Sequence, residues 1–234
     1  MAQYIKQVLC LVLTLAVAAA AAYGSEKMDY VVTNNARGSA GGARFDKEIG
    51  AQYARQTLMT ATDFIHRLFQ QNQNAADTKS VQRVSMIIEN IDEVAFASNN
   101  NIHVSSGFIE RYPQSQDIKR EITGLLYHQM AHLLQWDGNG QAPSGLMEGI
   151  ADYVRMKAGY AADHWNPPGV GNDWHQGYEV TAHFLNYCDG IRNGFVAALN
   201  KKMMTGYSEG YFTELLGKPV TQLWSDYKAM YANN

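Results

Sequence analysis

Cysteine is scarce in this sequence, which has two cysteines in 234 residues. Cys10 lies in an apolar N-terminal run, so Cys188 stands alone in the rest of the chain and an internal disulfide is excluded there. Stability must therefore come from a hydrophobic core, with a bound metal as a further source. Because Cys188 lies close to Phe184, Leu185 and Tyr187, we expect a buried structural thiol rather than a reactive one.

Long hydrophobic runs are also scarce, and residues 8–22 form the only one. Lys6 is the only charge before Glu26, and residues 20–22 are alanines, a pattern typical of a cleaved secretory signal peptide. A membrane helix is the alternative, but flanking stop-transfer charges are missing. We expect a signal peptide at residues 1–22 and a single domain at residues 23–234, which is long enough for one sizeable core.

An excess of basic charge is missing as well. The formal net charge is -3, and loss of Lys6 with the signal peptide makes it -4, from 18 basic against 22 acidic residues. No basic patch is visible, so nucleic acids and anionic membranes are not expected partners. The chain also lacks an Asn-x-Ser/Thr sequon, which excludes ordinary N-glycosylation.

The first half of the chain contains the residues that predict strands. β-branched or alternating apolar residues occur at 30–33, 81–91, 94–98 and 102–104. Asn99-Asn100-Asn101 supplies a turn, so the last two runs should form a hairpin. An edge strand of this kind can pair with an extended peptide, and an ordinary sheet edge is the other interpretation.

Helices are expected between and after these strands. Residues 46–69 carry apolar side chains near helical spacing and predict one long helix, whereas the glycine-rich residues 38–42 predict a loop. Further helical segments extend over most of the second half, so the fold class is α+β with a helical C-terminal half. They are a helix capped by Asp117 or Ser115 that ends near residue 136, a helix over residues 145–158 capped by Ser144, and helices near residues 177–190, 194–204, 208–216 and 220–231.

His128 and His132 stand at i and i+4 on one of these helices, so both imidazoles project from one face and can reach one ion. A catalytic zinc site has about three protein ligands and one open position. A pair with this spacing also occurs by chance on solvated helices, so it needs a third ligand. In the zinc-binding motif His-Glu-x-x-His, which has the same histidine spacing, a glutamate follows the first histidine. This chain has Gln129 at that position.

Glu148 is the best candidate for that third ligand, because it opens the next helix after a loop long enough to fold back. Asp152, one turn further on, can accept the outer N–H of a ligand histidine, and Arg155 can hold that carboxylate in place. The alternative is that Glu148 is a first-turn residue favoured by the helix dipole, while Asp152 and Arg155 form a surface ion pair. Asp137 is a second candidate for the third ligand.

The metzincin pattern is a different scheme for the third ligand, and this chain does not follow it. That pattern requires glycine at position 135 and histidine at position 138, where this chain has Gln135 and Gly138. A third histidine ligand from this loop is therefore excluded.

Several long stretches resemble the plant basic secretory protein family, a group of zincin-like metallopeptidases of plants and bacteria. The resemblance is carried by GLLYHQMAHLLQWDGNGQAPSGLMEGIADYVRMKAGY with the following HWNPPG, by DWHQGYEVTAHFLNYCDGIRNGFVAALNKKM, by LLGKPVTQLWSDYKAMY and by the early DYVVTNNA. It implies a secreted or cell-wall location, a zinc site of the gluzincin type on an α+β zincin fold, an edge hairpin over the metal-binding helix, extended peptides as substrates, and a link to plant defence. It places zinc on His128 and His132, with Glu148 as the third ligand.

Two features depart from the family. The chain is mildly acidic, which argues against binding to acidic wall polymers, and Gln129 replaces the family's glutamate. A glutamine can position water but cannot accept its proton, so we expect hydrolysis to be impaired. Glu121 lies two helical turns before His128 and is a poor substitute base, whereas Glu179 is less easily dismissed.

Two residues are candidates for stabilising an oxyanion. Tyr178 has a setting similar to that of the tyrosine which donates to the oxyanion in related gluzincins, and His183 is its rival. A core aromatic and a surface histidine are the plainer interpretations. The chain is therefore expected to be either a peptidase of low activity or a pseudopeptidase that binds peptide, wall polymer or a pathogen protein without cutting it.

Overall fold

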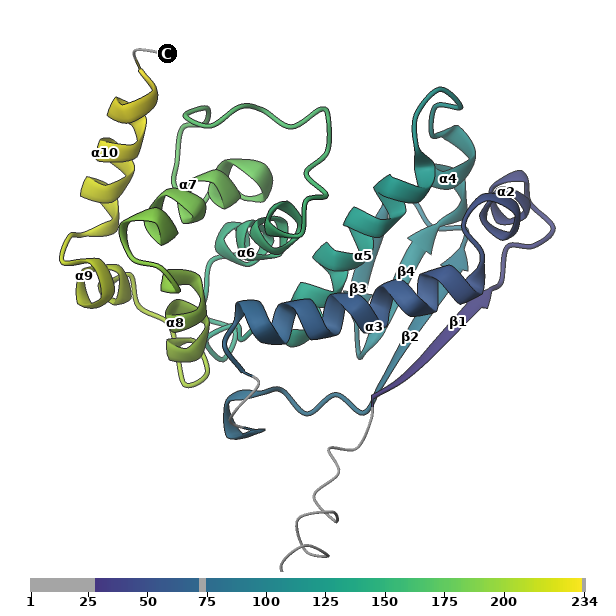
Figure 1. The fold of residues 1–234 in the computed structure, drawn as a ribbon, viewed down its shortest axis with the longest axis horizontal. Coiled ribbons are helices and arrows are strands. Elements are labelled where there is room, and N and C mark those ends of the chain that lie inside the picture. Colours follow the sequence, from purple (N-terminus) through teal and green to yellow (C-terminus); the bar gives the residue numbers. More distant parts are fainter. Residues whose placement is uncertain (1–27, 72–74, 233–234) are drawn as a thin grey trace, which may run out of the picture.

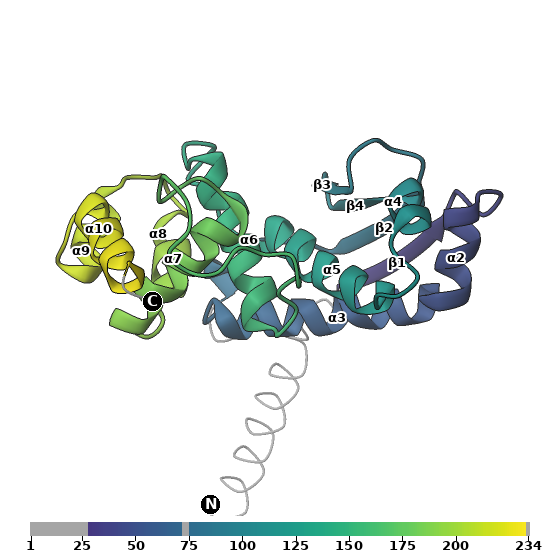
Figure 2. The ribbon, with the colours of Figure 1, turned by 90° about the horizontal axis from the view of Figure 1, so that it is seen from above.

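The computed structural model describes residues 28–71 and 75–232. The expected signal peptide at residues 1–22 lies outside this part of the chain. Within the described residues, no helix has both the length and the apolar character needed to cross a membrane. A strand-containing N-terminal part and a helical C-terminal part lie next to each other along the long axis of the molecule (Figures 1 and 2).

The sheet has four strands in the order β1-β2-β4-β3. β1 (Asp29–Asn34), β2 (Arg83–Glu89) and β4 (Asn101–Ser105) are parallel, and β3 (Ala95–Ser98) is antiparallel to β4 at the edge. The predicted hairpin is confirmed, because Asn99 and Asn100 both take positive φ, as a tight turn between twisted strands requires. Alternate residues of β2 are buried, so one face of the sheet forms the core.

The helices between β1 and β2 differ from the prediction. The predicted single helix is two, α2 (Ala40–Glu48) and α3 (Ala51–Leu68), separated at Gly50, whose φ is 79°. The expected loop at residues 38–42 is wrong for its last residues, which begin α2. Gly41 is a site of close approach, because a Cβ there would lie 1.8 Å from the Ser106 carbonyl oxygen at the start of α4 (Ser106–Arg111).

α5 (Ile118–Leu134) carries the histidine pair and packs against α3 and β3. Asp117 caps it by accepting a hydrogen bond from the Arg120 N–H at 3.0 Å, as predicted. α6 (Ser144–Lys157) packs against α5, but Ser144 is its first residue rather than its cap. A short 3₁₀ helix, Ala75–Asp77, precedes β2.

The C-terminal half is helical, as expected. Its elements are α7 (Tyr178–Ile191), α8 (Phe195–Lys202), α9 (Gly210–Leu216) and α10 (Val220–Tyr231). Phe184 of α7 lies at the centre of an aromatic cluster with Phe212 and Tyr227. Cys188 is buried as predicted, and burial raises the pKa of its thiol, so this thiol stays protonated at neutral pH.

Candidate metal centre

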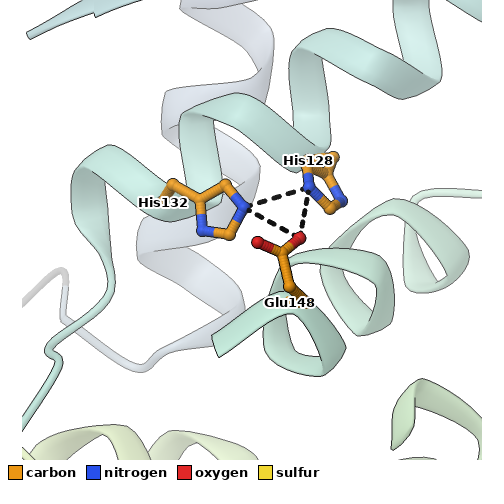
Figure 3. A group of neighbouring side chains, drawn as sticks. All are labelled: His128, His132 and Glu148. Atoms are coloured by element: carbon orange, nitrogen blue, oxygen red, sulfur yellow. Dashed lines mark hydrogen bonds and ion pairs between the residues drawn. The ribbon is translucent and has the colours of Figure 1, made fainter. Parts of the chain in front are cut away.

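Three potential metal ligands converge between α5 and α6 (Figure 3). His128 and His132 project from α5 one turn apart, and Glu148 reaches them from the first turns of α6. The two Nε2 atoms lie 3.0 Å apart. Oε2 of Glu148 lies 3.2 Å from Nε2 of His128 and 3.4 Å from Nε2 of His132. The other candidate ligand, Asp137, is exposed and lies outside this group.

This triangle has the size that a tetrahedral ion requires. With zinc–ligand distances of about 2.0–2.2 Å, two ligand atoms of a tetrahedral site lie about 3.3–3.6 Å apart. The three separations of 3.0, 3.2 and 3.4 Å are close to that edge length. The residues therefore fit a zinc ion with three protein ligands.

Asp152 contacts the outer nitrogen of His128, as the spacing predicted. Its Oδ1 lies 2.7 Å from Nδ1 of His128, and both side chains are buried. If Asp152 accepts the Nδ1–H, Nε2 of His128 keeps its lone pair free for a metal ion. The same hydrogen bond fixes the direction of the ring.

The ionisation of the three residues reflects their burial and their contacts. Burial alone would lower the pKa of His128, but the hydrogen bonds with Asp152 and Glu148 outweigh it and raise this pKa. For His132 burial prevails, and its pKa is lowered. Burial also opposes ionisation of Glu148, yet its contacts with both histidines lower its pKa to about 2. Glu148 is therefore a carboxylate at neutral pH, as a metal ligand must be.

Arg155 does not hold Asp152 in place, so that prediction is wrong. Its guanidinium instead donates to Glu121 of α5 at 2.8 Å, and its Nε donates to the Tyr160 carbonyl oxygen at 2.8 Å. The ion pair is largely buried, with 8% of the Arg155 and 12% of the Glu121 side chain exposed. Arg155 thus joins the two helices that carry the potential ligands.

The position of Glu148 depends on close packing of α6 against α7 and the loop before it. A Cβ at Gly145 would lie 1.7 Å from the His175 carbonyl oxygen, and one at Gly149 would lie 2.2 Å from Cγ2 of Thr181. Glycine at both positions therefore lets α6 approach α7 closely on either side of Glu148.

A cavity of about 740 Å³ opens in front of the three residues. Its lining includes residues 93–97, which cover most of the edge strand β3, and Tyr178 and Glu179 of α7. The rest of the lining combines apolar and aromatic side chains with polar and charged ones. The former are Leu125, Phe108 and Trp165, and the latter include Glu121, Arg155 and His164.

The family profile for BSP, described as peptidase of plants and bacteria, matches residues 25–227. The chain belongs to this family. A basic secretory protease of Boswellia serrata is 42% identical over 62 residues, which is 26% of this chain and 72% of that protein. No solved structure gives a significant match to the chain. The resemblance found in the sequence is thus confirmed, and so are the α+β class, the mixed sheet and the helical C-terminal half.

Gln129 directly follows His128 in the sequence and lines the cavity in front of the three potential ligands. It is 4% exposed, and its Nε2 makes a long contact of 3.5 Å with the Ala95 carbonyl oxygen of β3. Its Oε1 is buried and has no hydrogen-bond partner among the described residues. The amide thus contacts the edge strand and lines the same cavity as the potential ligands.

Tyr178 lies at the rim of the same cavity, with 55% of its surface exposed. Its ring is nearly parallel to that of His128, at 6.3 Å between centroids. The charge of Glu148, followed by partial burial, raises the pKa of Tyr178, so its hydroxyl remains a donor at neutral pH. The residue begins α7 at a φ of 47°, directly after Gly177, and both features fix its position.

His183 and Glu179 both contact Asn166. Nε2 of His183 lies 3.1 Å from the Asn166 carbonyl oxygen, and the residue is absent from the cavity lining described above. Glu179 is in that lining, but its carboxylate accepts a hydrogen bond from the Asn166 amide at 2.8 Å. Sequence reasoning missed the aromatic residue Trp165, although it lies in the stretch HWNPPG that carried the family resemblance.

Proposed function

We propose that this chain is a secreted zinc protein of the BSP family that binds extended peptides and hydrolyses them slowly at most. Zinc would be held by His128, His132 and Glu148, in a gluzincin type of site on a zincin fold. The observation that carries the proposal is the ligand triangle next to a cavity whose lining includes Gln129. Gln129 would stand there in place of the family's general-base glutamate.

The edge strand supports peptide as the ligand. Among residues 28–71 and 75–232, β3 pairs with β4 alone, and its residues Ala95, Phe96 and Ala97 line the cavity. An extended peptide can add to such an edge through main-chain hydrogen bonds, while its side chains contact the cavity. Three exposed apolar side chains, Val94, Phe96 and Tyr178, line this cavity, so the preferred ligand would carry apolar side chains.

Low turnover follows from the chemistry of Gln129. Bound zinc would supply a Lewis acid that activates water for attack on a peptide carbonyl. The Gln129 amide can hold that water by hydrogen bonding, but it has no basic oxygen to take the proton and pass it to the leaving amine. Loss of a positioned general base costs about 10²- to 10⁴-fold in rate.

The carboxylates nearby do not replace this base. Glu121 is held by Arg155, and Glu179 is bound by Asn166. Tyr178, in contrast, would keep its role, because its hydroxyl can donate to a peptide carbonyl oxygen at the rim of the cavity. The site would thus retain binding groups and lose its proton carrier.

A non-catalytic binding protein is the second candidate function. The contact of Gln129 with Ala95 favours it, since a glutamate could not donate a hydrogen bond to that carbonyl oxygen. Gln129 would then hold the edge strand through this hydrogen bond and take no part in catalysis. Secretion is supported by the name of the Boswellia relative, and a role in plant defence at the cell surface would follow from peptide or pathogen-protein binding.

Hydrolysis of an unfolded protein by the native chain and by Gln129→Glu tests the proposal. We expect Gln129→Glu to be about 10²- to 10⁴-fold faster, and a chelator to abolish its activity. Equal activity of the two proteins, abolished by the chelator in both, would refute the assignment of Gln129 as the missing base. Binding of an uncut apolar peptide by the native chain, with no measurable cleavage, would favour the second candidate.

A further inference from the structure

Residues 158–177 form a long loop between α6 and α7 that contains no helix or strand, and all of its residues are described. Loops of this length without secondary structure are uncommon in a compact domain, and many of them carry a binding function. Contacts with α10 hold the second half of this loop. Lys228 donates to the carbonyl oxygens of Gly169 and Gly171, and the Tyr227 hydroxyl oxygen accepts the Gly169 N–H at 2.7 Å.

Asn166 is the residue through which α7 holds the first half of the loop. Its side-chain amide donates to the Glu179 carboxylate at 2.8 Å, and its backbone carbonyl oxygen lies 3.1 Å from Nε2 of His183. Because a carbonyl oxygen can only accept, Nε2 of His183 is the donor. Glu179 and His183 lie one turn apart on α7, so two side chains from one face of this helix fix Asn166.

Trp165 directly precedes Asn166 and lines the cavity in front of the potential metal ligands. Its environment differs from that of the other tryptophans. Trp174 is buried in the hydrophobic core, and Trp136 and Trp224 pack against that core. Trp165 is half-buried and is not among the described residues that pack against the core. A large aromatic ring that lines a cavity instead of a core indicates a contact with a ligand.

Two side chains orient the Trp165 ring. The Arg155 guanidinium lies over it, 5.4 Å from the ring centroid. The His183 ring stands nearly perpendicular to it, with 88° between the planes and 6.3 Å between the centroids. His183 thus contacts both Trp165 and the backbone of the next residue, so its loss would release the ring and the loop together.

We propose that Trp165 is a peptide-binding residue that contacts an aromatic side chain of the ligand, and that His183 and Glu179 position it by holding Asn166. This inference rests on the proposed binding of extended peptides. It gives His183 a role in forming the binding cavity in place of the oxyanion role considered from the sequence.

An aromatic side chain is the ligand group that suits this part of the cavity best. Phe108 and Leu125 line the same cavity as Trp165, so an aromatic side chain would bury apolar surface there. Offset or edge-to-face contact with the Trp165 ring adds to this burial, and an aliphatic side chain of similar size lacks that contribution.

Calorimetric titration with two blocked pentapeptides tests the inference. Both consist of alanines around a central residue, which is phenylalanine in one and leucine in the other. We expect Trp165→Leu to bind the phenylalanine peptide about 3- to 10-fold more weakly than the native chain and the leucine peptide nearly as well. Trp136→Leu is the matched control, because Trp136 is also half-buried with a cation over its ring, Lys79 at 5.5 Å, but lies outside the cavity lining.

Two variants at position 183 test the positioning role. His183→Leu removes the donor to the Asn166 carbonyl oxygen, whereas His183→Gln keeps one, since a glutamine amide can donate. We expect His183→Leu to lose affinity for the phenylalanine peptide about as much as Trp165→Leu does, and His183→Gln to regain most of it. Circular dichroism checks that each variant is folded.

Tryptophan fluorescence gives a second readout that does not depend on a variant at position 183. The phenylalanine peptide should shift the emission of the native chain and of Trp136→Leu, and Trp165→Leu should lose this shift.

The outcomes separate this inference from the proposed peptide binding. Native affinity of a folded Trp165→Leu for the phenylalanine peptide, with the emission shift retained, would overturn the inference alone. Native affinity of His183→Leu, or equal losses in His183→Leu and His183→Gln, would overturn the positioning role. No binding of either peptide by the native chain would overturn the proposed function, and the inference with it.

Discussion

Replacing Arg155 with methionine should destabilise the protein strongly, because it removes one partner of a buried ion pair. Arg155 of α6 donates to Glu121 of α5 at 2.8 Å, and both side chains are at most 12% exposed. In Arg155→Met the Glu121 carboxylate stays in the cavity wall without its counter-charge. Breaking a buried pair in this way costs about 3–5 kcal/mol, and the residual exposure of Glu121 places the expected cost near the lower end.

Thermal and urea unfolding of the metal-free protein measure this cost. For a domain of this size 1 kcal/mol shifts Tm by about 2–4 °C, so a cost of about 3 kcal/mol lowers Tm by roughly 6–12 °C. The double variant Glu121→Leu with Arg155→Met should recover part of the loss, since no unpaired charge remains. Lys218→Met, which removes the exposed ion pair with Asp226, should change the stability far less than Arg155→Met, because water and salt screen this pair. The reasoning is refuted if Arg155→Met costs no more than Lys218→Met.

Three further predictions follow from other contacts. Gly41→Ala should cost about 3 kcal/mol in urea unfolding because its Cβ would overlap the Ser106 carbonyl oxygen, whereas Gly38→Ala has open space and should be nearly neutral; equal stabilities would contradict this. In excess chelator, the pKa of Glu148 is lowered to about 2 in the folded state, so its stabilisation is present above about pH 4.5 and is lost as pH falls towards 2. The difference in unfolding free energy between the native protein and Glu148→Gln should shrink over that range, and a constant difference would argue against the contacts. Phe96→Ala should weaken binding of an apolar peptide in a fluorescence titration by about 10-fold, and unchanged affinity would exclude β3 as the binding wall.

Local patterns predicted much of the fold. Alternating apolar residues predicted β2, and the asparagine turn predicted the hairpin. Both patterns depend on residues that are close in sequence. The start of α2 was missed because Gly41 suggests a loop when only propensity is considered. Glycine at position 41 instead allows a close contact with Ser106. Because Ser106 is distant in the sequence, no local pattern predicts this contact.

In the candidate site, too, local spacing predicted some features, whereas contacts between distant residues could not be predicted. Helical spacing alone brings His128 and His132 onto one face, and the loop before α6 is long enough to return Glu148 to them. The partner of Arg155 could not be predicted, since Asp152 is nearer in sequence but Glu121 shares its buried environment. Side-chain contacts across helices depend on packing, which single-helix spacing does not specify.

The central claim is that His128, His132 and Glu148 bind zinc, and metal content measures this most directly. The native protein, His128→Ala and His183→Ala are purified alike, and zinc per chain is measured by atomic spectroscopy. His183 lies near the site but contacts the Asn166 carbonyl oxygen, so its variant is the matched control. We predict about one zinc per chain in the native protein and in His183→Ala, as expected for a single three-ligand site, and loss of most of it in His128→Ala. Equal zinc content in all three proteins, or none in the native protein, would contradict the account.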